Sequence, residues 1–238
     1  MTSPTPATTV SRVPSRPATH AVAILALALV CTVGAWIALR GGEPFAIDIA
    51  WHSLVGVAPG SAGYAIAATL ATAGSAVGVA ACVGVVAMWL FFVGRRFDAA
   101  SLAATAVVGV ACNELLKLLI ARPRPVDALL EPPGFSYPSG HSMGAAVLAT
   151  GLALVCIAHA RSHRAHVWVS VAALLWVVIM MWSRTALHVH WLSDTIAGAL
   201  LGWAVAILVR GVLARTVLMR TMSNATTTTT RPPDLREP

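Results

Sequence analysis

Apolar runs long enough to cross a bilayer constrain this chain more than any other feature of its sequence. A hydrocarbon core about 30 Å thick requires roughly 20 apolar residues for each helical crossing. The sequence offers such runs at 21–39, 73–93, 99–120, 141–158, 167–182 and 191–209. Hydrophobic residues make up 58% of the 238 residues and charged residues only 11%, which leaves no room for a second, soluble domain. We therefore predict an all-α integral membrane protein, a helical bundle with about six transmembrane helices.

Both ends of the chain lack a hydrophobic period. Residues 1–20 are rich in Pro, Thr and Ser, and the C-terminal segment carries a run of Thr followed by Arg231 and two prolines. We expect a disordered cytoplasmic leader at 1–20, a membrane domain at 21–213 and a disordered cytoplasmic tail at 214–238. The run at 21–39 could be a secretory signal, but it is long for one and no clear cleavage site follows, so we interpret it as the first transmembrane helix.

The stretch between the first two crossings is ambiguous. Residues 62–93 are apolar for longer than one crossing needs, and Gly74 and Gly78 are possible breakpoints. We place the second crossing near 73–93 and expect residues 47–70 to form, in part, an outer interfacial helix anchored by Trp51. The sequence does not fix the register of residues 47–72.

The distribution of cations indicates an orientation rather than a nucleic-acid partner. The formal charge is +7, but the arginines flank apolar runs and form no basic face with interleaved aromatics. With both termini inside, the cytoplasmic helix ends carry Arg12, Arg16, Arg95, Arg96, Arg161, Arg164, Arg210, Arg215 and Arg220. The outer side then carries Arg40, Lys117, Arg122, Arg124 and Arg184. This bias agrees with the positive-inside rule, and it strengthens if some outer cations have a functional role.

Three polar segments fall at the outer ends of the predicted helices. The first runs from Lys117 to Arg124 and Pro125, and its two cations can reach one anion. Lys117 could instead be a helix-flanking charge paired with Glu114, three residues away.

The second segment is Pro138, Ser139, Gly140 and His141, at the start of a helix. Free backbone N–H groups, the helix dipole and the Ser139 hydroxyl suit an anion there, and Gly140 lets it approach the backbone. An ordinary helix start with Ser139 as cap would look the same.

The third segment contains Ser183, Arg184, His188, His190 and Asp194. His190 and Asp194 are four residues apart at a helix start, so the carboxylate could accept the imidazole N–H and fix the tautomer of a nucleophile or base. A structural His–Asp pair is the alternative. A metal site built from His188, His190 and Asp194 would need an extended segment and lacks a fourth ligand at a familiar spacing. We interpret His188 as a neighbour that lines the site.

Taken together, the three segments resemble the type 2 phosphatidic acid phosphatase (PAP2) superfamily, which also includes vanadium haloperoxidases. The pattern K-x6-R-P, P-S-G-H, S-R-x5-H-x3-D is matched at every fixed position, within a motif core at 70–210. The position of His188 departs from the family, which commonly has a small residue there. The matching residues are Lys117, Arg124, Pro125, Pro138, Ser139, Gly140, His141, Ser183, Arg184, His190 and Asp194.

The resemblance implies a membrane lipid phosphatase that works through a phosphohistidine. In that scheme His190 is the nucleophile, His141 the acid and base, and Asp194 the group that orients His190. Lys117, Arg124, Ser139, Gly140 and Arg184 bind phosphate. No metal or other cofactor is expected, and the partners are the bilayer and a lipid phosphate or diphosphate.

The sequence leaves the lipid and the oligomeric state open. We favour a polyprenyl diphosphate, because the predicted site faces outward; phosphatidate and phosphatidylglycerol phosphate are the other options. Arg122 is assigned to the pocket rim. The main alternative is a transporter or scaffold that keeps the ionisable cluster, although no internal repeat is visible. A haloperoxidase, usually soluble, does not fit the hydropathy.

Overall fold

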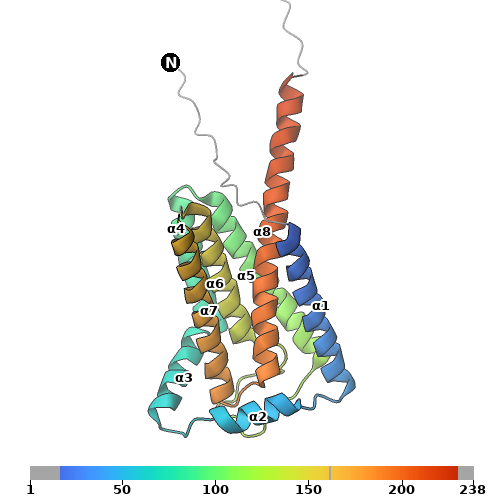
Figure 1. Ribbon diagram of the computed structural model, residues 1–238, viewed down its shortest axis with the longest axis vertical. Helices are drawn as coiled ribbons and strands as arrows, with labels where there is room; N and C mark the ends of the chain where they lie inside the picture. Colours follow the sequence, from blue (N-terminus) through green and yellow to red (C-terminus); the bar gives the residue numbers. More distant parts are fainter. Residues whose placement is uncertain (1–16, 161, 230–238) are drawn as a thin grey trace, which may run out of the picture.

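The computed structural model describes residues 17–160 and 162–229, with side chains described as far as Arg220. Within these ranges the chain forms α-helices and no strand, in agreement with the predicted all-α class (Figure 1). The helices are α1 (Pro17–Leu39), α2 (Ala46–Val55), α3 (Ala62–Ala73), α4 (Ala76–Phe92), α5 (Arg96–Ile120), α6 (Gly140–His159), α7 (His163–Ala186) and α8 (Leu192–Thr229).

Five of these helices are long and apolar enough to cross a membrane: α1, α5, α6, α7 and α8 as far as Arg220. The shorter helices α3 and α4 pass the same test only as a pair, and they meet at a bend of 56°. The predicted count of about six crossings therefore holds if this bent pair is one span.

The break between α3 and α4 falls at Gly74 and Ser75, so Gly74 is a breakpoint as expected, whereas Gly78 lies inside α4. Gly74 ends α3, and the Ser75 hydroxyl accepts a hydrogen bond from the Gly78 amide at 3.2 Å and caps α4. A cap at this point restarts the helix in a new direction, which explains the bend.

As expected, residues 47–70 form a helix across the end of the bundle only in part (Figure 1). They divide between α2, which lies across the end of the bundle, and α3, which belongs to the bent pair (Figure 1). The indole Nε1 of Trp51 donates to Thr185 Oγ1 on α7 at 3.1 Å. Trp51 thus joins α2 to the bundle by a hydrogen bond. We had expected Trp51 only as an anchor in the headgroup region.

The predicted disorder near the chain ends was too extensive. Residues 17–20 belong to α1, and α8 continues through Thr229 (Figure 1), whereas we expected disorder from residue 214. Leu, Met, Ala and Arg between residues 213 and 220 are good helix formers, and a helix already started in the bundle extends at little cost. The remaining parts of the predicted leader and tail, 1–16 and 230–238, lie outside the described residues.

The chain connections divide between the two ends of the bundle as the hydropathy predicted. The α1–α2, α5–α6 and α7–α8 connections lie at the end covered by α2, and the α4–α5 and α6–α7 connections lie at the other end (Figure 1). The described arginines assigned to the cytoplasmic side therefore lie away from α2; Arg12, Arg16 and Arg161 lie outside the described residues.

Helix α8 packs closely against α6, and this contact positions two of the three polar segments. A Cβ atom at Gly198 would lie 2.3 Å from the Ser139 carbonyl oxygen, so only glycine allows this approach. The Ser139 amide also donates to the Asp194 carbonyl at 3.0 Å. The starts of α6 and α8 are thereby fixed side by side.

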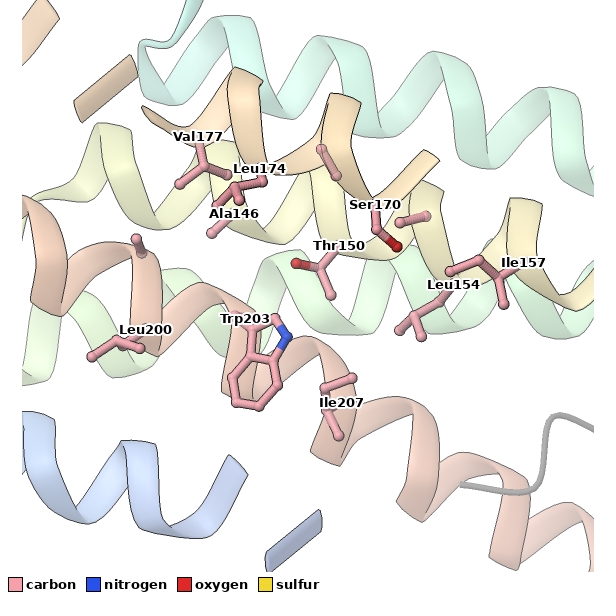
Figure 2. A pocket seen from close by; sticks show the side chains of 13 residues that line it. Ala146, Thr150, Leu154, Ile157, Ser170, Leu174, Val177, Leu200, Trp203 and Ile207 are labelled. Atoms are coloured by element: carbon pink, nitrogen blue, oxygen red, sulfur yellow. The ribbon is translucent and has the colours of Figure 1, made fainter. Parts of the chain in front are cut away.

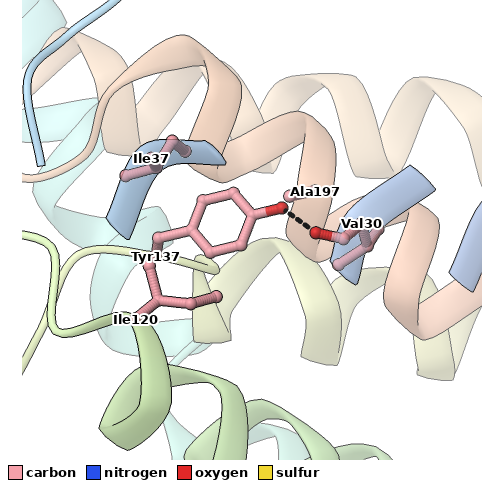
Figure 3. Packing of buried hydrophobic residues seen from close by; sticks show 5 residues of the cluster. All are labelled: Val30, Ile37, Ile120, Tyr137 and Ala197. Atoms are coloured by element: carbon pink, nitrogen blue, oxygen red, sulfur yellow. Dashed lines mark hydrogen bonds between the residues drawn. The ribbon is translucent and has the colours of Figure 1, made fainter. Parts of the chain in front are cut away.

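Tyr137 anchors the same region to α1. Its ring packs with Val30, Ile37, Ile120 and Ala197, and its hydroxyl donates to the Val30 carbonyl at 2.7 Å (Figure 3). Because Tyr137 directly precedes the Pro138–His141 segment, this contact holds the connection from α5 to α6 in place.

An apolar groove of about 390 Å³ lies between α6, α7 and α8, and the residues that line it carry no charge (Figure 2). Its lining contains the hydroxyls of Thr150 and Ser170 among apolar residues that include Trp203. The groove lacks acid, base and cation, so the chemistry must lie elsewhere.

Candidate active site

The three polar segments predicted from the sequence meet at the end of the bundle covered by α2. Their positions are the last turn of α5, the α5–α6 connection, the start of α6, the end of α7 and the start of α8. At their centre is His190, in the short connection between α7 and α8, with only 3% of its surface exposed.

One nitrogen of the His190 ring carries a lone pair that accepts a hydrogen bond from a cation. Arg124 Nη1 lies 3.1 Å from His190 Nε2, and an arginine N–H can only donate, so Nε2 must accept. The ring hydrogen of the neutral imidazole is therefore on Nδ1. Nε2 then carries the lone pair that a nucleophile or general base needs.

Asp194 orients the other side of the ring through a serine. We expected a direct hydrogen bond, but His190 Nδ1 lies 3.7 Å from Asp194 Oδ2. The Ser136 hydroxyl lies 3.3 Å from Nδ1 and donates to Asp194 Oδ2 at 2.5 Å. Sequence analysis missed Ser136, although it stands only two residues before Pro138.

Burial favours the neutral form of His190. It lowers the pKa of His190 to about 3, although the nearby Asp194 carboxylate acts in the opposite direction. The imidazole is therefore unprotonated at neutral pH, as a nucleophile must be.

The Asp194 carboxylate is itself held by a buried arginine. Arg122 Nη1 lies 2.5 Å from Asp194 Oδ1, and Arg122 Nη2 lies 2.9 Å from Asp48 Oδ2. All three side chains are fully buried. Arg122 is therefore not at a pocket rim, as we had assigned it; it joins α2 to α8 beneath the site. The signal for Asp48 was a lone carboxylate within the apolar run from Ile47.

Replacement of Arg122 by Met is expected to destabilise the protein strongly, because it leaves Asp48 and Asp194 buried without a cation. Breaking a buried ion pair typically costs about 3–5 kcal/mol. Thermal unfolding in detergent measures the effect. Arg40→Met is the matched control, since Arg40 lies on the same side of the bundle and is exposed. Similar unfolding midpoints for the two variants would contradict this role of Arg122.

Arg184 is a buried cation with unused donors. Its exposed fraction is 2%, and its Nε and Nη1 atoms have no hydrogen-bond partner among the described residues. Arg184 and Arg124 both interact electrostatically with His141 and with His190. Buried guanidinium groups are normally paired, so one with two such donors near the catalytic candidates indicates a place for an anion.

The other two predicted cations are engaged differently. The guanidinium of Arg124 donates to the carbonyls of Pro133, Gly134, Phe135 and Val189, and no carboxylate of the described residues pairs with it directly. Lys117 Nζ pairs with Glu114 Oε1 at 2.9 Å, which is the alternative that the sequence left open. Glu114 is largely exposed, and such a pair is weak enough for Lys117 to exchange partners.

The start of α6 lies beside Lys117, and Ser139 caps it as the sequence suggested. A Cβ atom at Gly140 would lie 3.6 Å from Lys117 Nζ, which brings the first amides of α6 next to that cation. His141 Nε2 lies 2.9 Å from the Ala71 carbonyl oxygen on α3. The imidazole of His141 is thus held at the junction between α6 and the bent helix pair.

His188 turns away from His190. Its Nδ1 lies 2.8 Å from Asp127 Oδ2, whereas His190 Nδ1 is directed to Ser136 and Asp194. The ligand set of His188, His190 and Asp194 considered from the sequence is therefore not assembled.

These features define a class: an all-helical membrane protein with a buried His–Ser–Asp relay and a cluster of cations at one end of its bundle. The family model of the PAP2 superfamily matches residues 98–217. That range is half of the chain, and the protein belongs to this superfamily.

Two curated proteins are similar to part of the chain. An undecaprenyl-diphosphatase of Sulfolobus acidocaldarius is 30% identical over 125 residues, which are 50% of this chain and 56% of that protein. Phosphatidylglycerophosphatase B of Bacillus subtilis is 36% identical over 103 residues, or 42% of this chain and 50% of that protein. The matches thus span about half the length of these relatives.

Two crystal structures share the fold. A PAP2-type phosphatidylglycerolphosphate phosphatase from Bacillus subtilis superposes with a TM-score of 0.68 at 23% identity, over 79% of this chain and 94% of that one. LpxE from Aquifex aeolicus gives a TM-score of 0.57 at 22% identity, over 70% and 96% of the two chains.

Proposed function

We propose that the protein is a membrane lipid phosphatase that hydrolyses the phosphomonoester or diphosphate of a lipid. The observation that carries the proposal is Arg184, a guanidinium that is only 2% exposed and whose Nε and Nη1 have no hydrogen-bond partner in the described part of the chain. A tetrahedral phosphoryl group would provide the missing acceptors. Membership of the PAP2 superfamily and the phosphatase activities of its relatives support the same conclusion.

The proposed reaction has two steps. First, His190 Nε2 attacks phosphorus in line, and the bond from phosphorus to the leaving oxygen breaks as His141 gives that oxygen a proton. Then His141 takes a proton from a water molecule, which attacks the phosphohistidine and breaks the N–P bond to release phosphate. Since Arg124 occupies Nε2 at rest, the substrate must draw this guanidinium onto its own oxygens.

Asp194 and Ser136 keep Nδ1 of His190 protonated and aimed throughout. Phosphoryl transfer depends mainly on positioning and on stabilising charge on the equatorial oxygens. Arg124, Arg184, Lys117, the Ser139 hydroxyl and the Gly140 amide are the groups we assign to that charge. With His190 and His141 they provide a nucleophile, an acid and an anion cradle from side chains and backbone.

We propose that the substrate is a lipid and that the site faces the extracytoplasmic side. The cations away from α2 mark the cytoplasmic side by the positive-inside rule. A cavity of about 620 Å³ at the α2 end is lined by Arg124, Trp191 and His52, which is room for a headgroup. A polyprenyl diphosphate is the favoured substrate, because such carriers are recycled on the outer face; phosphatidate and phosphatidylglycerol phosphate are the alternatives.

Phosphate release from these three lipids by the purified protein tests the proposal. We expect turnover of at least one lipid, and we expect EDTA to leave the rate within about twofold, because the proposed chemistry uses no metal. No release from any lipid would favour a transporter or scaffold. Activity that vanishes with EDTA while the protein stays folded, and that returns with Zn²⁺, would contradict the proposed mechanism.

A further inference from the structure

A second polar cluster lies beside the active site and has no part in the proposed reaction. It consists of His52 on α2, Asp127 in the α5–α6 connection and His188 in the α7–α8 connection. Asp127 Oδ2 lies 2.9 Å from His52 Nε2 and 2.8 Å from His188 Nδ1. The three ligand atoms lie within 4.8 Å of one another. Three segments far apart in the sequence thus place two imidazoles and a carboxylate around one point.

The two imidazole rings are stacked so that they share this point. Their centroids are 3.6 Å apart and their planes make an angle of 27°. Each ring directs one nitrogen at the same carboxylate oxygen. Because a nitrogen lone pair lies in the ring plane along the N–H direction, loss of these hydrogens would aim both lone pairs at one place.

A change of tautomer in His188 gives up only its hydrogen bond to the Asp127 carboxylate, which a bound cation would replace. Its Nε2 is buried next to Gly56 and has no partner among the described residues. Moving the ring hydrogen from Nδ1 to Nε2 therefore leaves Nε2 as it was, without a partner, and frees Nδ1 for a cation. His52 and Asp127 keep 19% and 54% of their side-chain surface exposed, so water can reach the same point.

The backbone at His188 has a conformation that is uncommon for a residue other than glycine. Its φ angle is +55°, in the left-handed region where glycine is favoured and a bulky side chain is strained. A histidine at such a position needs contacts that offset this strain. The stack with His52 and the contact with Asp127 are those contacts.

We propose that His52, Asp127 and His188 form a binding site for a divalent transition-metal ion of the zinc class. Two imidazole nitrogens and one carboxylate oxygen are ligands that Zn²⁺ takes, with water in the remaining position. The bound ion joins α2 to the two connections that carry Arg124 and His190. It thus stabilises the outer wall of the 620 Å³ cavity without contact with the reacting atoms.

Thermal unfolding of the full-length, tag-free protein in detergent, first stripped with chelator, tests the proposal. Added Zn²⁺ is expected to raise the unfolding midpoint, because an ion that binds only the folded state stabilises it. Mg²⁺ at the same concentration is expected to have no effect, since it prefers oxygen ligands. Calorimetry should give one high-affinity Zn²⁺ per chain.

Two variants and a control separate this site from adventitious binding. His188→Gly relieves the positive φ angle, so the metal-free protein should unfold no earlier than wild type, yet its response to Zn²⁺ should disappear. His52→Gln should also lose the response. His163→Gln, at an exposed histidine at the start of α7, should keep it. A Zn²⁺ response that is absent in wild type, or that persists in both site variants, overturns the proposal.

Discussion

Replacement of His190 by Ala is expected to abolish phosphate release. The side chain supplies the nucleophilic Nε2, and loss of a nucleophile commonly lowers kcat by about 10⁴-fold or more. Because His190 is buried, Ala also leaves a cavity, and a loss of folding must be separated from a loss of chemistry.

His190→Gln makes that separation. The Gln side-chain oxygen can accept the Arg124 hydrogen bond that Nε2 accepts now, so packing and charge are largely kept, while the nucleophile is gone. We expect an unfolding midpoint near that of wild type and phosphate release as low as in His190→Ala. A folded His190→Gln protein that keeps about a tenth of the activity or more would exclude His190 as the nucleophile.

Arg184→Met is expected to raise the stability of the protein and to lower its activity. Arg184 is buried, and two of its nitrogens have no hydrogen-bond partner among residues 17–160 and 162–220; burying a charge without a partner costs several kcal/mol. Met has a similar length and no charge, so the folded state should become more stable. Activity should fall by about 10³-fold, the scale at which an arginine that stabilises a phosphoryl transition state acts.

Arg184→Lys is the informative companion. It keeps the charge but loses the planar fork, so we expect activity between that of wild type and Arg184→Met. Arg215→Met, at an exposed position on α8, controls for the loss of a cation and should change neither quantity. If Arg184→Met lowered the unfolding midpoint as strongly as Arg122→Met, Arg184 would be a structural cation rather than an anion ligand.

The long helices were predictable because each depends on one property, the length of an apolar run. The α3–α4 pair was harder, since residues 62–93 are apolar throughout and only Gly74 and Ser75 mark the break. The predicted end of the last helix was wrong for a related reason. Composition suggested disorder after residue 213, but a helix stabilised by packing further back continues through residues that could not start one.

The polar segments were predictable because motif spacing carries them: Lys117 to Arg124, Pro138 to His141 and Arg184 to Asp194. The contacts that hold these segments in place were not predictable, because they join distant parts of the chain. Arg122 is 74 residues from Asp48 and 72 from Asp194. No local pattern pairs a lone aspartate in an apolar run with one arginine among several.

The Asp194–His190 contact illustrates the same limit at short range. A separation of four residues at a helix start predicts neighbouring side chains, and the two are neighbours. Spacing could not reveal that Ser136, 54 residues before His190, would lie between them. The roles assigned to these residues remain predictions that only chemistry can test.

Acid-quench trapping of the phosphoenzyme tests the central claim most directly. The purified protein is mixed with a lipid substrate labelled at the phosphate, stopped within its first turnovers, digested and mapped by mass spectrometry under conditions that preserve phosphohistidine. We predict one labelled peptide with phosphate on His190, and none in His190→Gln. Phosphate on another residue, or active turnover with no labelled intermediate and direct transfer to water, would contradict the account.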